Sequence, residues 1–307
     1  MEYHGKWFVI VNPKAQGGGA GGSWPEIRRV LENTGLDFSY AFTDCASTTS
    51  GLTLRALSEG FGGVAVFGGD GTLSTVGAVL SSVEDPPVLG QIPAGSGNDW
   101  IRSLGIPQDR VSVALLLKKG HTRSVDTGVC TACGVRMPFI NSAGMGFDAF
   151  VLKRTLALRK LLPLKKSGYL VSLFIAALWP PRFSATVLAD GNAFHSGRYF
   201  SLTVGVGRFS GGGMSLSPSA VIDDGLLDAV RIAPVGFPTI AANIGRIYSG
   251  TLMDMKQARG ARAASFSVVP QGNVLLELDG EFQVFPEKPE KLVFDTGPVL
   301  RVITSPT

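Results

Sequence analysis

The chain has 307 residues, of which 45% are hydrophobic and 17% are charged, so it is not a disordered chain and is long enough for two folded domains. Its formal net charge of +4 is too small for a dedicated nucleic-acid binder but suits an anionic ligand or an anionic membrane surface. The apolar stretch 168–181 is shorter than the roughly 20 residues that cross a bilayer, and the N-terminal apolar run is too short for a secretion signal. We therefore expect a cytoplasmic protein without a transmembrane helix.

The first third of the chain alternates between strand-like and helix-like segments. Strands are predicted at 7–11, 38–42, 62–67 and 88–92, and helices at 26–33, 52–58 and 72–80, with a glycine-rich loop at 15–22 before the first helix. Such alternation predicts an α/β domain with a parallel sheet and helices on both faces. Ligands of these sheets collect at the carboxyl ends of the strands.

From about residue 122 the pattern changes to short apolar runs separated by Gly, Asp, Asn and Pro turns. Strands are predicted at 184–188, 199–206, 227–232, 266–269 and 274–278, and helical interruptions at 150–178 and 239–253. This pattern predicts a mainly β second domain, a sandwich or a flattened barrel. We place the first domain at 1–133 and the second at 134–292, and the closing segment 293–307, with a strand at 299–304, can return to the first domain.

Polar turns rich in small residues follow three of the predicted strands. They read NPKAQGGG from Asn12, GGDGT from Gly68 and PAGSGND from Pro93. Glycines between a strand and a helix leave backbone N–H groups and the positive end of the helix dipole exposed, which favours a bound phosphate. For GGDGT alone an ordinary glycine turn is the alternative, because the chain holds 40 glycines. The convergence of three such turns at one sheet edge favours the phosphate site.

Further polar motifs lie in the second domain. They are NSAGMGFDA at 141–149, DDGLLD at 223–228 and LDGE at 278–281. A carboxylate on a tight Asp-Gly turn at a strand end can project into a cleft without burying its charge, so LDGE is the best candidate for a general base. A solvated hairpin turn is the alternative, since Asp-Gly is a common hairpin signal.

Taken in this order, with Asn12-Pro13 at their head, the motifs resemble those of the diacylglycerol kinase catalytic-domain family, which includes bacterial lipid kinases and sphingosine and ceramide kinases. They run from residue 12 to residue 281, nearly the whole chain. The resemblance implies an N-terminal α/β domain like that of the phosphofructokinases and NAD kinases, and a C-terminal β sandwich for the lipid substrate. It also implies ATP, with Mg²⁺, in the cleft between them.

The same resemblance implies which residues contact the nucleotide. The matching positions are Asn12, Thr43, Gly68, Gly69, Asp70, Gly71, Thr72, Leu73, Ser74, Thr75, Ser96 and Asn98. Asp70 is also implied in catalysis, by ordering either Mg²⁺ or the loop. Ser74 and Thr75 depart from the family, which usually has Asn or His followed by Glu there. Asp99 is as readily a helix cap as a catalytic group.

Phosphoryl transfer needs groups that neutralise the phosphates, a base for the attacking hydroxyl and a site that holds the acceptor in line. The resemblance implies that Glu281 is the proton acceptor and Asp279 its helper. It also implies a structural Mg²⁺ bound by the Asp224 carboxylate and the backbone carbonyls of Val221 and Leu226. Oxygen ligands suit this hard cation, and a plain acidic turn is the alternative.

The segment from Lys153 to Arg182 mixes basic and apolar residues. It suits a helix on an anionic membrane surface, and a core-packing helix with a solvated basic face is the alternative. Because a lipid substrate is insoluble, we favour the membrane surface and expect peripheral membrane association.

These observations predict an ATP- and Mg²⁺-dependent lipid kinase, with diacylglycerol as the default acceptor and phosphatidic acid as the product. A kinase for a sphingoid base or another alcohol, and a non-catalytic nucleotide- or lipid-binding protein, remain alternatives. We expect no nucleic-acid partner, and an exposed sheet edge in the β domain could allow a homodimer.

Overall fold

The computed structural model describes residues 2–161 and 182–306, and the chain divides into two compact units. The first unit comprises Met1–Thr127 and Gly297–Thr307, and the second comprises Gly128–Thr296. The sequence predicts the first domain at 1–133 and the second at 134–292, so the observed boundaries differ by a few residues. Strand β6 (Gly128–Ala132) and strand β19 (Leu292–Thr296) pair with each other, which places both in the second unit.

The first unit is built on a six-stranded sheet with the order β2-β1-β3-β4-β20-β5. Its strands are β1 (Trp7–Val11), β2 (Phe38–Phe42), β3 (Gly63–Gly68), β4 (Val88–Pro93), β5 (Thr122–Val125) and β20 (Leu300–Ile303). Neighbouring strands from β2 to β20 are parallel, and β5 is antiparallel to β20. The predicted α/β class is confirmed, and the C-terminal strand β20 does return to the first unit.

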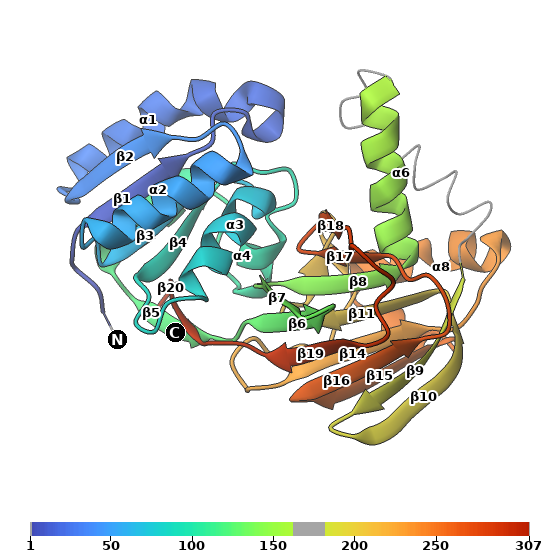
Figure 1. Ribbon diagram of the computed structural model, residues 1–307. Helices are drawn as coiled ribbons and strands as arrows, with labels where there is room; N and C mark the ends of the chain where they lie inside the picture. Colours follow the sequence, from blue (N-terminus) through green and yellow to red (C-terminus); the bar gives the residue numbers. More distant parts are fainter. Residues whose placement is uncertain (1, 162–181, 307) are drawn as a thin grey trace. The chain divides into compact units, whose positions relative to one another are not determined.

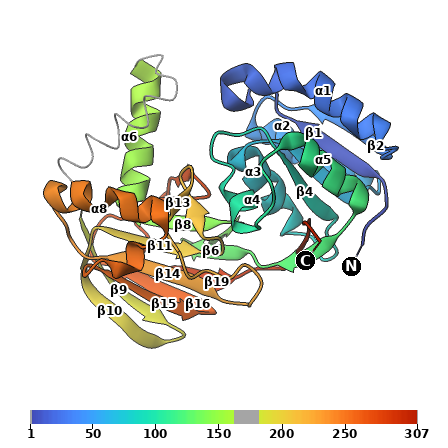
Figure 2. The same ribbon diagram turned by 180° about the vertical axis from the view of Figure 1, so that it is seen from behind.

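Helices cover both faces of this sheet. They are η1 (Ala15–Gly18), α1 (Gly19–Asn33), α2 (Ala46–Ser58), α3 (Asp70–Leu80), α4 (Asp99–Ser103) and α5 (Arg110–Lys119). Helix α1 packs beside α5 and helix α2 packs beside α3 (Figures 1 and 2). The apolar strands β1, β3 and β4 are buried along their whole length, as expected for a parallel sheet covered on both sides.

Helix α1 begins earlier than the sequence predicts. Residues 19–22 of the predicted glycine loop form its first turn, because Ala20 and Trp24 bury the same helix face as Ile27 and Leu31. Gly21 lies against Pro13, where a Cβ would come within 3.2 Å of the proline Cβ. The glycines therefore allow the helix to start close to the strand end, which local propensity does not reveal.

The second unit is a β sandwich, which confirms the predicted mainly β domain. One sheet has the order β10-β9-β16-β19-β6-β7 and the other β15-β14-β11-β8-β17-β18. The strands not yet given are β7 (Val135–Phe139), β8 (Ser142–Gly146), β9 (Phe183–Ala189), β10 (Asn192–Tyr199), β11 (Ser201–Gly205), β12 (Phe209–Ser210), β13 (Met214–Ser215), β14 (Leu227–Ile232), β15 (Ala258–Ala263), β16 (Ser265–Pro270), β17 (Leu276–Leu278) and β18 (Glu281–Gln283). Large aromatic side chains, including Phe139, Phe266 and Phe294, are fully buried in this unit.

Among the described residues, helices α6 (Phe147–Leu161) and α8 (Phe237–Ser249) and the short 3-10 helix η2 (Leu252–Asp254) accompany the sandwich. Helix α6 packs against β8, β17 and β18, while every residue of α8 keeps some exposure. Of the predicted helix 150–178 and the overlapping basic segment Lys153–Arg182, residues 162–181 lie outside the described part of the chain. Among the described residues, no helix is long and apolar enough to span a membrane.

Candidate functional site

The GGDGT motif of the first unit occupies the junction between β3 and α3. Gly68 ends the strand, Gly69 is the N-cap in extended conformation, and the helix begins at Asp70. The predicted turn is therefore shorter than expected, and the motif's last residues belong to the helix. The first backbone N–H groups of a helix have no partner within it and carry its positive dipole end. This arrangement is compatible with a bound phosphate.

The loop after β4 packs directly on the GGDGT motif. A Cβ on Gly69 would lie 2.9 Å from Gly95 Cα, and a Cβ on Gly95 would lie 2.6 Å from Gly69 Cα. Only glycine at both positions allows this approach of the two backbones.

The Asp70 carboxylate stabilises the contact between the GGDGT motif and the loop after β4. One oxygen accepts the Asn98 N–H at 2.8 Å and the other accepts the Asp99 N–H at 2.9 Å, at the start of α4. Burial raises the pKa of Asp70, the neighbouring Asp99 raises it further, and these backbone hydrogen bonds oppose the shift. Of the two roles predicted for Asp70, this geometry supplies loop ordering, and a carboxylate retains lone pairs for a cation.

Asn12, Thr72 and Asn98 meet around the same motif. The Asn12 side-chain amide, at the end of β1, donates to the Thr72 hydroxyl at 2.8 Å, and its carbonyl oxygen accepts the Lys14 N–H at 3.0 Å. Asn98 adopts a left-handed conformation with φ of 53°, and its side-chain oxygen accepts the Gly95 N–H at 3.0 Å. The strand ends of β1, β3 and β4 thus bring together residues from three separate motifs.

The other predicted nucleotide positions lie nearby with different surroundings. Thr43 follows the edge strand β2, is buried, and hydrogen-bonds the Cys45 carbonyl and the Thr49 hydroxyl. Ser96 is exposed in the loop after β4. Thr75 donates its hydroxyl to the Gly71 carbonyl within α3, and Leu73 is fully buried. The half-buried Ser74 and Thr75 stand where the resemblance leads one to expect Asn or His and then Glu.

Two residues that the sequence interpretation missed hold the loop after β4 in place. Arg110 donates to the Pro93 carbonyl at 2.9 Å, to the Ser23 hydroxyl at 2.7 Å and to the Gln16 side-chain oxygen at 2.8 Å. Gln16 in turn donates to the Gly95 carbonyl at 3.1 Å. No local pattern marks this cluster, because its members are far apart in the sequence.

In the second unit, LDGE forms the hairpin between β17 and β18. Leu278 pairs with Glu281 across a tight turn in which Asp279 has φ of 49° and Gly280 φ of 80°. The Asp279 carboxylate accepts the N–H groups of Ile140, Asn141 and Ser142 at 2.8, 2.9 and 2.9 Å. Asp279 therefore anchors the turn to the start of β8, and Glu281 is exposed.

A second carboxyl group, which sequence reasoning did not select, lies beneath this turn. Glu277 is buried and accepts the Gly280 N–H at 2.6 Å. A Cβ on Gly144 of the neighbouring strand would overlap one of the Glu277 carboxyl oxygens. Burial raises the pKa of Glu277 well above its usual range, and Asp148 and Asp279 add to the shift. The only sequence signal was a charged residue in an otherwise apolar strand.

The predicted Mg²⁺ position in DDGLLD has an arginine beside it. One Asp224 oxygen accepts the Leu226 N–H at 3.1 Å, and the other contacts the Arg262 guanidinium from β15. The same guanidinium lies 3.3 Å from the Asp228 carboxylate. Within the described residues, no three His, Cys, Asp or Glu side chains are grouped to hold a metal ion. The implied site has one carboxylate and two backbone carbonyls, and the positive charge of Arg262 at that carboxylate opposes a divalent cation there.

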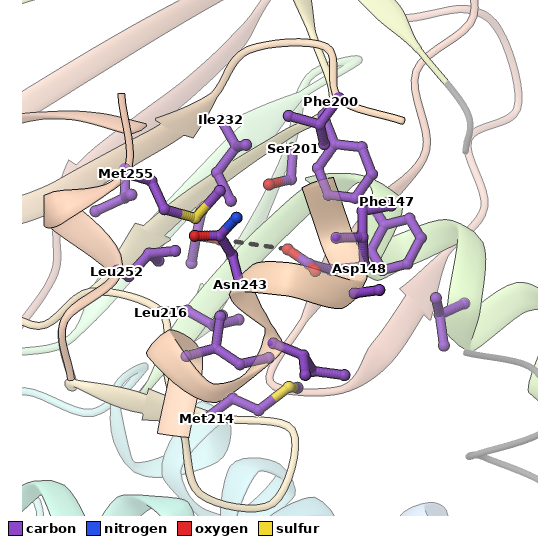
Figure 3. Close-up of a pocket in the computed structure, with 18 of the residues that line it drawn as sticks. Phe147, Asp148, Phe200, Ser201, Met214, Leu216, Ile232, Asn243, Leu252 and Met255 are labelled. Carbon is purple, nitrogen blue, oxygen red and sulfur yellow. Dashed lines mark hydrogen bonds between the residues drawn. The ribbon is translucent and has the colours of Figure 1, made fainter. Parts of the chain in front are cut away.

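An apolar pocket of about 480 Å³ lies in the second unit (Figure 3). Residues of α6, α8, β11 and β14 line it, among them Phe147, Ile232 and Ile244, together with Phe200 just before β11. Figure 3 shows polar groups of Asp148, Ser201 and Asn243 directed into this apolar space. The pocket has the size and the composition of a site for a largely apolar small molecule.

Asp148, from the NSAGMGFDA motif, marks the polar end of the pocket. Its carboxylate accepts the Thr203 hydroxyl at 3.3 Å, and burial raises its pKa to about 6. A Cβ on Gly144 would lie 3.2 Å from Asp148 Cβ and would also overlap Glu277. Asp148 and Glu277 therefore flank Gly144, so that the polar end of the pocket adjoins the strand that leads to Glu281.

Comparison with known proteins agrees with this architecture. Residues 6–130 match the diacylglycerol kinase catalytic domain, and residues 141–298 match the YegS C-terminal NAD kinase beta sandwich-like domain. The chain belongs to the YegS-like branch of the diacylglycerol kinase family. It is therefore a relative of lipid kinases, and its fold class is the one that the motifs predicted.

Relatives cover nearly the whole chain. "Probable lipid kinase YegS-like" of Xanthomonas oryzae pv. oryzae is 32% identical over 284 residues, 90% of this chain and 89% of the relative. "Diacylglycerol kinase" of Mycobacterium tuberculosis is 27% identical over 282 residues, with 91% and 89% covered. A crystal structure of a diacylglycerol kinase from Bacillus anthracis str. Sterne shares the fold with a TM-score of 0.74 at 23% identity, covering 98% of this chain and 97% of that one.

The three hydrogen bonds to Asp279 predict a large effect of Asp279→Ala. Removing the carboxylate leaves three backbone donors without their acceptor, so the free energy of unfolding should fall by about 3 kcal/mol or more in chemical denaturation. Asp190→Ala is the matched control, because Asp190 also precedes a glycine in a hairpin and has φ of 46°, and among the described residues its carboxylate accepts only the Ser265 N–H. Equal losses for the two variants would contradict the anchoring role.

Glu277→Gln should stabilise the protein most at high pH. The pKa of Glu277 is raised in the folded state, so the native carboxyl stays protonated and is tolerated at low pH. The free energy of unfolding falls as pH rises from the ordinary carboxyl pKa toward the raised one, because ionising this buried group is unfavourable. Glutamine still accepts the Gly280 N–H and carries no charge. In thermal melts the gain in Tm over the native protein should be larger at pH 8 than at pH 5. An equal gain in Tm at both pH values would contradict a destabilising ionisation of the buried Glu277.

Proposed function

We propose that this protein transfers the γ-phosphoryl group of ATP to the hydroxyl of a membrane lipid, with diacylglycerol as the default acceptor and phosphatidic acid as the product. The observation that carries the proposal is the apolar pocket in the second unit, whose polar end adjoins the strand leading to Glu281. Family membership supports a lipid kinase in general, and the pocket supports a lipid acceptor for this chain.

The pocket has room for one hydrocarbon chain. Its volume of about 480 Å³ lies within the roughly 300–1,000 Å³ of pockets that bind drug-sized, largely apolar ligands. Each buried methylene contributes about 0.8 kcal/mol to binding. One acyl chain of diacylglycerol would enter the pocket, and the second would stay in the bilayer.

ATP would bind with its phosphates at the GGDGT motif of the first unit. Asp70 and the Arg110 cluster fix the two loops there, so that the N–H groups at the start of α3 are already oriented before nucleotide arrives. Mg²⁺ bound with ATP supplies neutralisation of the phosphate charge. The remaining proposed contacts from this unit are Asn12, Thr43, Ser96 and Asn98.

The acceptor would lose its proton to Glu281. As the lipid oxygen forms a bond to the γ-phosphorus, the bond from that phosphorus to the leaving oxygen of ADP breaks, and the hydroxyl proton passes to the carboxylate. Asp279 and Glu277 act through the turn, Asp279 by accepting N–H groups at the start of β8 and Glu277 by accepting the Gly280 N–H. Both are positioning residues, and only Glu281 is proposed to touch the acceptor.

Asp148 favours a second candidate acceptor, a sphingoid base. A carboxylate accepts hydrogen bonds, and a sphingoid base offers an amine and two hydroxyl groups, whereas diacylglycerol offers one hydroxyl. If Asp148 binds the head group, an acceptor with an additional donor gains more from it than diacylglycerol does. The third hypothesis is a protein that binds nucleotide or lipid without turnover.

We also propose peripheral contact with an anionic membrane. Lys153, Arg154 and Leu156 of α6 are exposed, as are Ile244 and Tyr248 of α8. Basic and apolar side chains together favour the surface of an anionic bilayer, where the acceptor resides. A cytoplasmic location and a homodimer remain part of the proposal.

Glu281→Gln should abolish turnover and spare nucleotide binding. Losing a general base typically lowers the rate by about 10²–10⁴-fold, and the exposed Glu281 contributes little to the fold. The measurement is the initial rate of lipid phosphorylation, together with the calorimetric Kd for an ATP analogue. A variant that keeps native turnover would exclude Glu281 as the base, and absence of turnover in the native protein with every lipid would favour the binding-only reading.

Ala241→Trp on α8 should discriminate against long acceptors. Ala241 lines the pocket, whereas its neighbour Ala242, also exposed on α8, does not, so Ala242→Trp is the matched control. The indole takes up space that a long chain needs, and KM should rise at least about tenfold for a sixteen-carbon acceptor and less for an eight-carbon one. Equal effects of the two substitutions on KM would show that the acceptor chain does not bind in this pocket.

A further inference from the structure

The DDGLLD loop is held by an arginine at the place where the family resemblance implies a cation. Arg262 lies on β15 directly across from Asp228 on β14, so strand pairing brings its side chain to the loop. Its guanidinium contacts the Asp224 carboxylate through one terminal nitrogen and lies 3.3 Å from Asp228 through Nε. One cationic group thus joins both carboxylates to a neighbouring strand.

The surroundings of Asp224 oppose a divalent cation. Its two oxygens accept the Leu226 N–H and the Arg262 guanidinium, and a second positive centre at this carboxylate would be repelled by the arginine. Asp228, the last carboxylate of the motif, is itself buried and paired with the same guanidinium. The Arg262 guanidinium therefore already offsets part of the negative charge that a cation would neutralise.

A second arginine supports the same loop from its other end. Arg208 donates to the Ala220 carbonyl at 2.9 Å, just before Val221, whose carbonyl the resemblance implies as a ligand. The loop from Ala220 to Asp228 is consequently fixed at both ends by guanidinium groups.

We propose that Arg262 ties the DDGLLD loop to strand β15 in place of a structural divalent cation, so that the fold of the second unit does not depend on Mg²⁺. The proposal concerns stability and stands independently of the acceptor and of the kinase activity. It predicts that this chain differs from relatives that bind a cation through this segment.

The test is the Tm of the full chain without nucleotide, measured after treatment with EDTA and after adding Mg²⁺ back. The native protein should melt at the same temperature in both conditions. Arg262→Met should lower the Tm by about 3 °C in EDTA, because two carboxylates lose their partner. Added Mg²⁺ should then recover part of that loss, since Asp224 is free to bind it.

Arg259→Met is the matched control, since Arg259 lies on the same strand and its guanidinium donates only to the Lys256 and Ala258 carbonyls in the described hydrogen bonds. Its Tm should fall less and should not respond to Mg²⁺. The proposal is overturned if EDTA lowers the native Tm and Mg²⁺ restores it. It is also overturned if the two arginine variants lose the same stability and neither responds to the cation.

Discussion

Carboxylates that accept backbone N–H groups hold the motif-bearing loops in both units. Asp70 collects the N–H groups of Asn98 and Asp99, and Asp279 collects those of Ile140, Asn141 and Ser142. Each bond joins segments that are far apart in the sequence, and a charged acceptor makes such bonds stronger than neutral ones. The positions of the GGDGT motif and of Glu281 depend on these two side chains.

Close backbone approach is the second constraint. The contact of Gly69 with Gly95 and the space that Gly144 leaves for Glu277 both exclude any side chain. The glycines of these motifs are therefore needed for packing between loops as well as for exposing N–H groups. Gly69, Gly95 and Gly144 each lie against a specific neighbour, and this close contact sets how tightly their segments pack.

The sequence predicted those parts of the protein that local patterns determine. The parallel sheet, the β sandwich and the convergence of Asn12, Asp70 and Asn98 follow from apolar periodicity and from the rule that parallel strands share a carboxyl edge. The start of α1 at Gly19 was missed because buried Ala20 and Trp24 override the low helix propensity of glycine. The Arg110 cluster, the Glu277 carboxyl and the pairing of Arg262 with Asp224 arise from tertiary contacts, which no window of sequence contains.

The central claim is phosphoryl transfer to a lipid, and the most direct measurement is incubation of the full chain with γ-labelled ATP, Mg²⁺ and a total lipid extract in mixed micelles. The organic phase is then separated by chromatography beside standards of phosphatidic acid and sphingoid-base phosphate. The account predicts a labelled lipid that extracts into the organic phase. Label present only as free phosphate, or remaining in ATP with every lipid tested, would contradict it.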